Sequence, residues 1–145
     1  MLLIDQKTTS TATLDYSSQW FHYLNMPSWC YILYTVLAKA TKFSNSNLQG
    51  CRFYRAYLVK TNFSGADLRG AALEDTSMDD SNMKDVVAIG AYFSASINDA
   101  ASLENADFTD AQFPTKTLPL LCERPDVKGT NPTTGADTRE SLMCP

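Results

Sequence analysis

Large apolar residues recur at every fifth position through the middle of this 145-residue chain, and this period constrains its fold more than any other feature. An α-helix repeats its apolar face about every 3.6 residues and a strand about every 2 residues, so neither element produces a period of five. The members of this central series are Phe43, Leu48, Phe53, Leu58, Phe63, Leu68, Leu73, Met78, Met83, Ala88, Phe93, Asn98, Leu103, Phe108 and Phe113. Only Ala88 and Asn98 depart from the large apolar type.

A second series precedes the first by two residues, and all its members are small or β-branched. It begins at Thr41 and Ser46 and continues to Ala111 without a charged residue. Two inward positions in every five residues require one corner per pentapeptide. Repeats of this kind predict a solenoid, in which each turn buries its apolar face by stacking on the next turn. We therefore expect an all-β solenoid.

The five-residue unit resembles the motif of the pentapeptide-repeat family: a small residue, Asp or Asn, Leu or Phe, and two polar residues. Two units that follow the motif closely are Ala66-Asp67-Leu68-Arg69-Gly70 and Ala106-Asp107-Phe108-Thr109-Asp110. The resemblance implies a right-handed quadrilateral β-helix with four pentapeptides per coil. The fifteen units would then make nearly four coils, with short helical caps at both ends.

Four units per coil place residues that are twenty apart above one another. Gly50, Gly70 and Gly90 fall in one such column, at a corner where glycine readily supplies positive φ. Opposite charges also stack in this register, in the pairs Arg55–Asp75, Lys60–Asp80 and Lys84–Glu104. Such exposed pairs specify register more than they stabilise the fold.

The unit around Asn98 breaks the apolar series. One interpretation turns Asn98 inward with its amide bonded to the coil backbone, and the other shifts the chain so that Ile97 points inward. We favour the inward Asn98, because the register is unchanged at Leu103.

The repeat divides the chain into three segments. We expect an N-terminal arm and apolar cap helix in residues 1–40, the β-helix in residues 41–113, and a C-terminal cap with a polar tail in residues 114–145. A solenoid leaves an open apolar end, which the cap helix would cover. The alternatives for the first segment are a membrane-associated or interfacial helix, and a mispredicted N-terminus.

The charge and hydropathy of the chain argue against two classes of protein. A net charge of −4 disfavours a nucleic-acid binder, which would carry a basic face. No apolar run reaches the roughly 18 residues of a membrane-spanning helix, so we expect at most peripheral membrane association. The first residues, from Met1 to Asp5, do not resemble a signal peptide.

The four cysteines fall into two groups. Cys51 lies in the small inward series and is expected to be a buried small hydrophobe, and Cys30 lies in an apolar run and is expected to be packed. Cys122 and Cys144 bracket the polar tail with no His or Cys cluster around them. A disulfide between these two is the favoured interpretation, and it would indicate an oxidising compartment.

The C-terminal tail indicates which members of the pentapeptide-repeat family this chain resembles. Leu121-Cys122, Gly129-Thr130-Asn131-Pro132, Thr134-Gly135, Asp137-Thr138-Arg139 and Ser141-Leu142 before Cys144 resemble the ending of the thylakoid-lumen pentapeptide-repeat proteins of plants, algae and cyanobacteria. This resemblance implies a lumenal protein of a photosynthetic organism, with a C-terminal disulfide and no established biochemical activity. Such proteins begin with a bipartite transit peptide, and none is visible here.

The sequence shows no catalytic constellation, metal-ligand cluster or phosphate loop. Its hydroxyl residues fall in the inward series, and its carboxylates are expected on an outward, solvated face: Asp75, Asp79, Asp80, Asp85, Asp99, Asp107 and Asp110. A small solenoid with a filled interior offers no obvious pocket. We therefore expect no enzyme activity, no cofactor and no small-molecule substrate.

One turn carries apolar residues at outward positions: Val87, Ile89, Tyr92 and Ile97. Clustered exposed apolar residues mark interaction surfaces, so this turn is a candidate protein-binding patch. The alternative is that these residues pack under the N-terminal arm or the tail.

Two functional hypotheses follow. The first is an interaction or scaffold module of the thylakoid lumen with an unknown protein partner. The second, by analogy within the family, is a DNA-mimicking protein that binds the topoisomerase gyrase. That role uses a longer and more acidic solenoid, and a gyrase supercoiling assay would discriminate the two.

Overall fold

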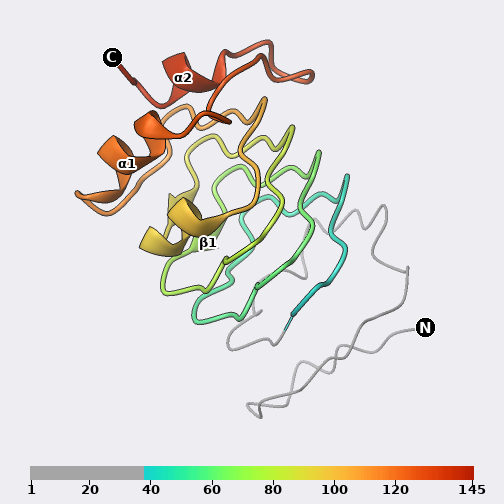
Figure 1. Ribbon diagram of the computed structural model, residues 1–145. Coiled ribbons are helices and arrows are strands. Elements are labelled where there is room, and N and C mark those ends of the chain that lie inside the picture. Colours follow the sequence, from blue (N-terminus) through green and yellow to red (C-terminus); the bar gives the residue numbers. More distant parts are fainter. Residues whose placement is uncertain (1–37) are drawn as a thin grey trace.

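The computed structural model describes residues 38–145, which form a stack of roughly square coils closed at one end by the C-terminal residues (Figure 1). Residues twenty apart pair in parallel, as in Arg52↔Ala72 and Asn62↔Asn82. Pairs of this spacing occur on four faces of the stack, which is the geometry of four pentapeptides per coil. The predicted stacking of residues twenty apart is therefore correct.

Hydrogen bonds between coils follow one rule. The N–H of a central residue donates to a carbonyl of the next coil, as Phe43 does to Asn62 (2.7 Å). The N–H of the preceding residue donates to the coil below, as Asn62 does to Thr41 (2.9 Å). Because each face is so short, most pairs are single bridges. Regular strands in the described part of the chain are limited to β1 (Ala72–Leu73) and β2 (Tyr92–Phe93), which pair in parallel.

The geometry of each corner explains the residue types of the repeat motif. A tight turn closes each unit, as when the Ser46 N–H donates to the Phe43 carbonyl (3.2 Å). The fifth residue then adopts positive φ, which favours Gly, Asn and Asp, and Gly50, Gly70 and Gly90 do so in one column. The Asn or Asp of the unit accepts the amide two residues on, as Asn62 Oδ1 does from Ser64 (2.9 Å).

The core is the interior of the coils. Every central residue from Phe43 to Phe108 is buried except Asn98, and Phe113 is partly buried at the end of the stack. Two aromatic trios lie in this core. Phe43, Phe53 and Phe63 form the first, and Phe93, Phe108 and Phe113 form the second, each with one stacked and two edge-on pairs.

The preferred interpretation of Asn98 is wrong. A 3-10 helix, η1 (Ala95–Asp99), replaces the pentapeptide geometry and turns Ile97 into the core, where its side chain is fully buried. The two corner positions of this segment are Ala95 and Ala100. Ala100 keeps a φ of −61° and does not form a left-handed corner. The register is regained at Leu103.

Serine hydroxyls replace the backbone bonds that η1 removes. Ser96 Oγ accepts from the Met78 N–H (3.1 Å) and donates to the Thr76 carbonyl (2.7 Å). Ser94 Oγ also lies 2.8 Å from that carbonyl. The hydroxyl of Ser96 therefore bridges one coil to the next where the ladder is interrupted.

We predict that Ser96→Ala lowers the free energy of unfolding by about 1–3 kcal/mol, because the Met78 N–H loses its partner. Ser94→Ala is the matched control: Ser96 still serves the Thr76 carbonyl, so its cost should be smaller. Urea unfolding of both variants measures the difference. Equal costs would show that Ser96 is not the bridge.

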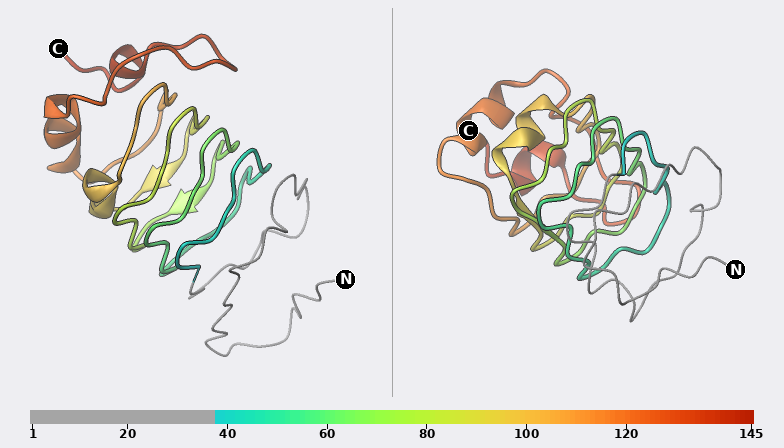
Figure 2. Two further views of the ribbon diagram at one scale, coloured as in Figure 1. Left: turned by 45° about the vertical axis from the view of Figure 1, so that its right-hand side comes forward. Right: turned by 90° about the horizontal axis from the view of Figure 1, so that it is seen from below.

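The C-terminal residues fold back over the last coil. They contain α1 (Thr117–Glu123) and α2 (Thr138–Ser141), which lie at one end of the stack (Figure 2). Asp137 caps the N-terminus of α2, since its Oδ1 accepts from the N–H groups of Arg139 and Glu140. Residues 1–37 of the segment expected to form the arm and cap helix lie outside the described residues.

Long-range hydrogen bonds attach this tail. The Leu103 N–H donates to Asp126 Oδ2 (2.8 Å), the Asn105 N–H to the Lys128 carbonyl (2.9 Å), and the Phe108 N–H to Ser141 Oγ (3.0 Å). Amides of the last coil that have no coil above them are thus paired by the tail. The tail takes the place of a further coil and closes this end of the solenoid.

Gly129 allows the tail to approach the coil closely. It has a φ of +88°, and a Cβ built on it would collide with Asn105 Oδ1. Asn105 Nδ2 donates to Asp85 Oδ1 (2.8 Å), so its side chain moves only by losing that bond.

We predict that Gly129→Ala destabilises the protein more than Gly135→Ala does. Both replace glycine at positive φ, which costs roughly 1 kcal/mol, but a Cβ built at Gly135 meets no atom beyond its chain neighbours within 4 Å. Thermal unfolding of the two variants isolates the Asn105 contact. Identical melting temperatures would contradict the close approach.

The disulfide bonding of the described cysteines follows the sequence prediction for Cys122 and Cys144 and goes beyond it for Cys51. Cys122 and Cys144 form the predicted disulfide, with Cα atoms 5.5 Å apart. Cys51 is fully buried as expected, and it is also disulfide-bonded, which the sequence did not predict. None of the cysteines among the described residues is free.

Candidate protein-binding face

The sequence-predicted patch does not form as one surface. Tyr92 is exposed (46%) and Ile89 is partly exposed, but Val87 and Ile97 are buried (3% and 0%). Ile97 enters the core through η1. Val87 lies between Asp67 and Asp107 in the ladder, and the tail bonds to its neighbour, since Asn131 Nδ2 donates to the Val86 carbonyl. The patch prediction is therefore wrong for these two residues.

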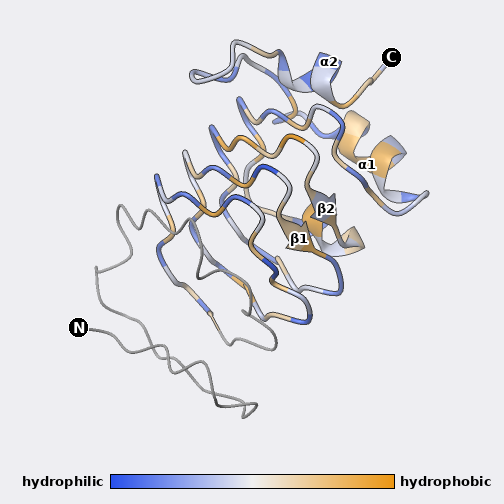
Figure 3. Ribbon diagram, turned by 180° about the vertical axis from the view of Figure 1, so that it is seen from behind, coloured by the Kyte–Doolittle hydropathy of each residue, from blue (hydrophilic) through white to orange (hydrophobic). Residues whose placement is uncertain are grey.

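Tyr92 instead belongs to a different surface, which we call the Tyr92 face. Its outward column is Arg52, Ala72, Tyr92 and Gln112, one residue from each coil. β1 and β2 carry the two middle residues of this column (Figure 3). The regular pairing of these strands fixes the positions of Ala72 and Tyr92 on the face.

A shallow groove of about 460 Å³ crosses the Tyr92 face. Its sides carry two tyrosines and two charged residues, and its floor consists of small residues. The lining residues are Gly50, Arg52, Tyr54, Gly70, Ala72, Glu74 and Tyr92. The glycine corner contributes no side chains, so the groove is open along that edge.

The groove has the composition of a protein-binding surface. Tyrosine and arginine are enriched at protein interfaces, because their large planar groups supply contact area and polar contacts at low entropic cost. Arg55 stacks over the Tyr54 ring, with its Cζ 5.2 Å from the ring centroid. Of the large exposed apolar residues, Tyr92 is the one that lies in this groove.

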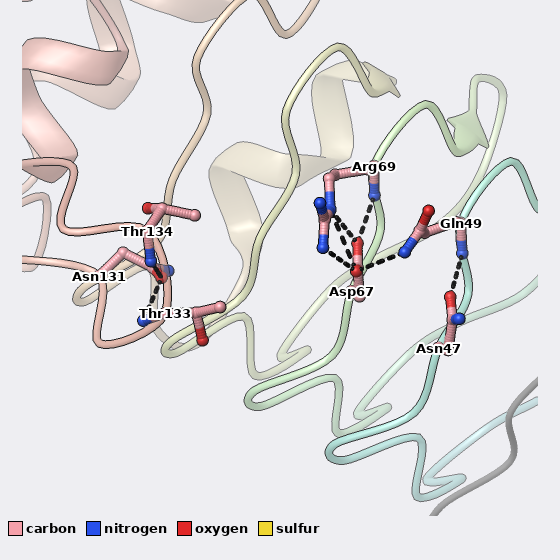
Figure 4. A network of polar contacts seen from close by, with 7 residues as sticks. All are labelled: Asn47, Gln49, Asp67, Arg69, Asn131, Thr133 and Thr134. Atoms are coloured by element: carbon pink, nitrogen blue, oxygen red, sulfur yellow. Dashed lines mark hydrogen bonds and ion pairs between the residues drawn. The ribbon is translucent and has the colours of Figure 1, made fainter.

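A neighbouring face carries a polar network around Asp67 (Figure 4). Arg69 forms a close ion pair with Asp67 (2.6 Å), and Gln49 Nε2 donates to the same carboxylate (2.7 Å). Burial disfavours the charged form of Asp67, but the hydrogen bonds from Arg69 and Gln49 outweigh it and lower its pKa. This network links two coils and has a structural role.

Two carboxylates where the tail meets the last coil, Asp107 and Asp126, are also structural. Burial raises the pKa of Asp126, but the hydrogen bonds from Arg124 and the Leu103 N–H outweigh this effect, so the net pKa is lowered. The pKa of Asp107 is lowered against burial by Thr109 and Thr134. Asp107 is only 1% exposed, so its expected place on a solvated face is wrong. None of these carboxylates is tuned toward neutral pH.

Other predicted features of the surface are present in part. Lys84 and Glu104 form the predicted ion pair (3.6 Å). Within residues 38–145, the pairs Arg55–Asp75 and Lys60–Asp80 do not form. The same residues contain no cluster of three or more metal-ligating side chains. No helix among them is long and apolar enough to span a bilayer.

One family model matches the first part of the repeat. Residues 39–75 match the model of the pentapeptide repeats, in eight copies. No curated protein matches the chain. Among solved structures, the chain is similar to a pentapeptide repeat protein from the thylakoid lumen of Arabidopsis thaliana, at 24% identity over 81% of this chain and 94% of that one, with a TM-score of 0.47. It is also similar to QnrB1, a plasmid-mediated fluoroquinolone resistance protein, at 15% identity over 55% of this chain and 35% of that one, with a TM-score of 0.33.

Proposed function

We propose that this chain of pentapeptide repeats is a non-enzymatic protein-interaction module of the thylakoid lumen, and that it binds its partner through the Tyr92 face. The proposal includes a right-handed β-helix of nearly four coils in residues 41–113 as the scaffold, with residues 114–145 as its cap. The partner is a protein, and the proposal requires no cofactor, nucleic acid or small-molecule substrate.

The observation that carries the proposal is the groove around Tyr92. Tyr92 exposes 46% of its surface beside a floor of glycine and alanine, and Tyr54, Arg52 and Glu74 lie around it. A side chain or backbone segment of a partner can contact both the rings and the bare floor. A rigid β-helix holds these groups in place, so little order has to be created on binding.

Two features support the location. The tail motif resembles that of thylakoid-lumen pentapeptide-repeat proteins, and the disulfide Cys122–Cys144 is typical of an oxidising compartment. The carboxylates with shifted pKa values support the non-enzymatic part, because hydrogen bonds that hold the coils and the tail together account for each of them.

The test is capture of proteins from thylakoid extract on the immobilised chain, on Tyr92→Ser and on Tyr57→Ser. Tyr57 is the matched control, since it is also an exposed tyrosine (38%) but lies on another face. Quantitative mass spectrometry should show proteins that Tyr92→Ser loses and Tyr57→Ser retains. Identical sets for all three baits would overturn the proposal. Equal melting temperatures for the three baits would show that the comparison is between folded proteins.

A further inference from the structure

We propose that the start of the solenoid, residues 38–60, binds the surface of a membrane that carries anionic lipids. The contact is made by exposed basic side chains, which we call the basic band: Lys39, Lys42, Arg52, Arg55 and Lys60. This inference goes beyond the proposed function, since it concerns a different ligand. Tyr92 lies two coils above Arg52 in the same column, so it stays accessible to a protein partner when the basic band is on a membrane.

The charges of the chain are separated along the solenoid. Residues 38–60 contain the five basic side chains of the band and no Asp or Glu, whereas residues 61–145 contain fourteen Asp and Glu against six Lys and Arg. The basic band and the C-terminal cap lie at opposite ends of the described structure (Figure 2). A chain with a net charge of −4 therefore has one positive end, which an anionic surface attracts and orients.

The basic band extends around the solenoid and is not confined to one face. Lys42 and Arg52 lie two units apart in a coil of four units, so they project from opposite faces. Arg55 and Lys60 adopt positive φ (58° and 59°) and occupy the two corners of a third face. A partner that approaches from one side contacts only part of this band. A flat surface perpendicular to the solenoid axis is within reach of all of it, because Lys and Arg side chains are long and flexible.

Most of the basic band is not neutralised by carboxylates of the chain. Four of its members form no ion pair within residues 38–145: Lys39, Lys42, Arg55 and Lys60. Asp75 and Asp80 are the corner residues one coil further from this end. Coils lie roughly 4.8 Å apart and the Debye length is about 8 Å at physiological ionic strength, so the carboxylates of the third and fourth coils are largely screened from a surface at this end.

The test is co-sedimentation of the full chain with vesicles of phosphatidylglycerol and phosphatidylcholine, and with vesicles of phosphatidylcholine alone. The chain should bind the anionic vesicles, and its affinity should fall as the salt concentration rises. Lys42→Gln/Lys60→Gln should weaken this binding by roughly tenfold or more, since each basic residue near an anionic surface contributes about fivefold.

Lys116→Gln/Lys128→Gln is the matched control. Both lysines are exposed residues of the tail and form no ion pair within residues 38–145. This variant therefore removes the same charge from the opposite end of the solenoid, and it should bind the anionic vesicles as the unchanged chain does. Equal melting temperatures would show that the comparison is between folded proteins.

Three results would overturn membrane binding by the basic band. They are no binding to the anionic vesicles at low salt, equal binding to vesicles of phosphatidylcholine alone, and an equal loss of binding in the two double variants. If the chain binds neither kind of vesicle but Lys42→Gln/Lys60→Gln loses proteins captured from thylakoid extract, the basic band binds an acidic protein and not a membrane. Capture that depends on Tyr92 is measured separately, so the proposed function stands or fails independently of the vesicle experiment.

Discussion

Phe63→Ala should lower the free energy of unfolding by about 3–5 kcal/mol, the usual cost of removing a fully buried phenylalanine side chain. Phe63 has no exposed surface. Its ring stacks on Phe43, with centroids 5.4 Å apart, and meets Phe53 edge-on at 6.0 Å. The substitution therefore opens a cavity between two coils and removes both ring contacts. The melting temperature should fall by roughly 2–4 °C for each kcal/mol.

Two further variants identify the cause. Phe113→Ala removes a ring that stacks on Phe93 in the same way (5.3 Å) but is only partly buried, so its cost should be clearly smaller. Phe63→Leu keeps an apolar side chain of the type found at neighbouring central positions, and should cost about 1–1.5 kcal/mol. If Phe63→Ala were no worse than Phe113→Ala, burial inside the coils would not be the main source of stability.

Asn131→Ala should lower the free energy of unfolding by about 2–4 kcal/mol, because one buried side chain makes four hydrogen bonds, two to the solenoid and two within the tail. Asn131 Nδ2 donates to the carbonyls of Val86 and Asn105, both at 2.9 Å. Its Oδ1 accepts from the N–H groups of Thr133 (2.9 Å) and Thr134 (3.1 Å). The side chain is 1% exposed, so water does not replace these partners.

Asn62→Ala is the matched control for Asn131→Ala. Asn62 accepts one local bond from the Ser64 N–H (2.9 Å), so its loss should cost no more than about 1 kcal/mol. Asn131→Asp retains the acceptor and lacks both donors, so it should be comparably destabilising to Asn131→Ala. Urea unfolding measures all three variants. A loss for Asn131→Ala no larger than that for Asn62→Ala would mean that this side chain does not hold the tail.

The candidate site could be predicted from the sequence only in part. The sequence predicts that Tyr92 points outward, but it predicts the same for Val87 and Ile97, which are buried. The groove was missed, although one signal was available: steps of twenty place Ala72 between Arg52 and Tyr92, beside the column of Gly50 and Gly70. A small residue between large ones in such a column indicates a hollow on the face.

The sequence by itself determined the coil, because the information that specifies it is local. An apolar residue at every fifth position, a small residue two places earlier, and Gly, Asn or Asp at the corners require one turn per pentapeptide whatever the rest of the chain does. The sequence also predicts the disulfide Cys122–Cys144, because the two cysteines bracket the polar tail with no His or Cys cluster around them.

Only the tertiary structure decided where the pentapeptide geometry is interrupted and which residues cover the end of the solenoid. Whether Ile97 or Asn98 turns inward depends on hydroxyl bonds to the coil below and on Arg124, which donates to the carbonyls of Asn98 (2.6 Å) and Ala100 (2.8 Å) from the tail. Asp107 becomes buried, and Asn131 reaches 45 residues back to Val86, because the tail folds over the last coil. Contacts between such distant segments leave no periodic mark in the sequence, so their geometry becomes visible only in the folded chain.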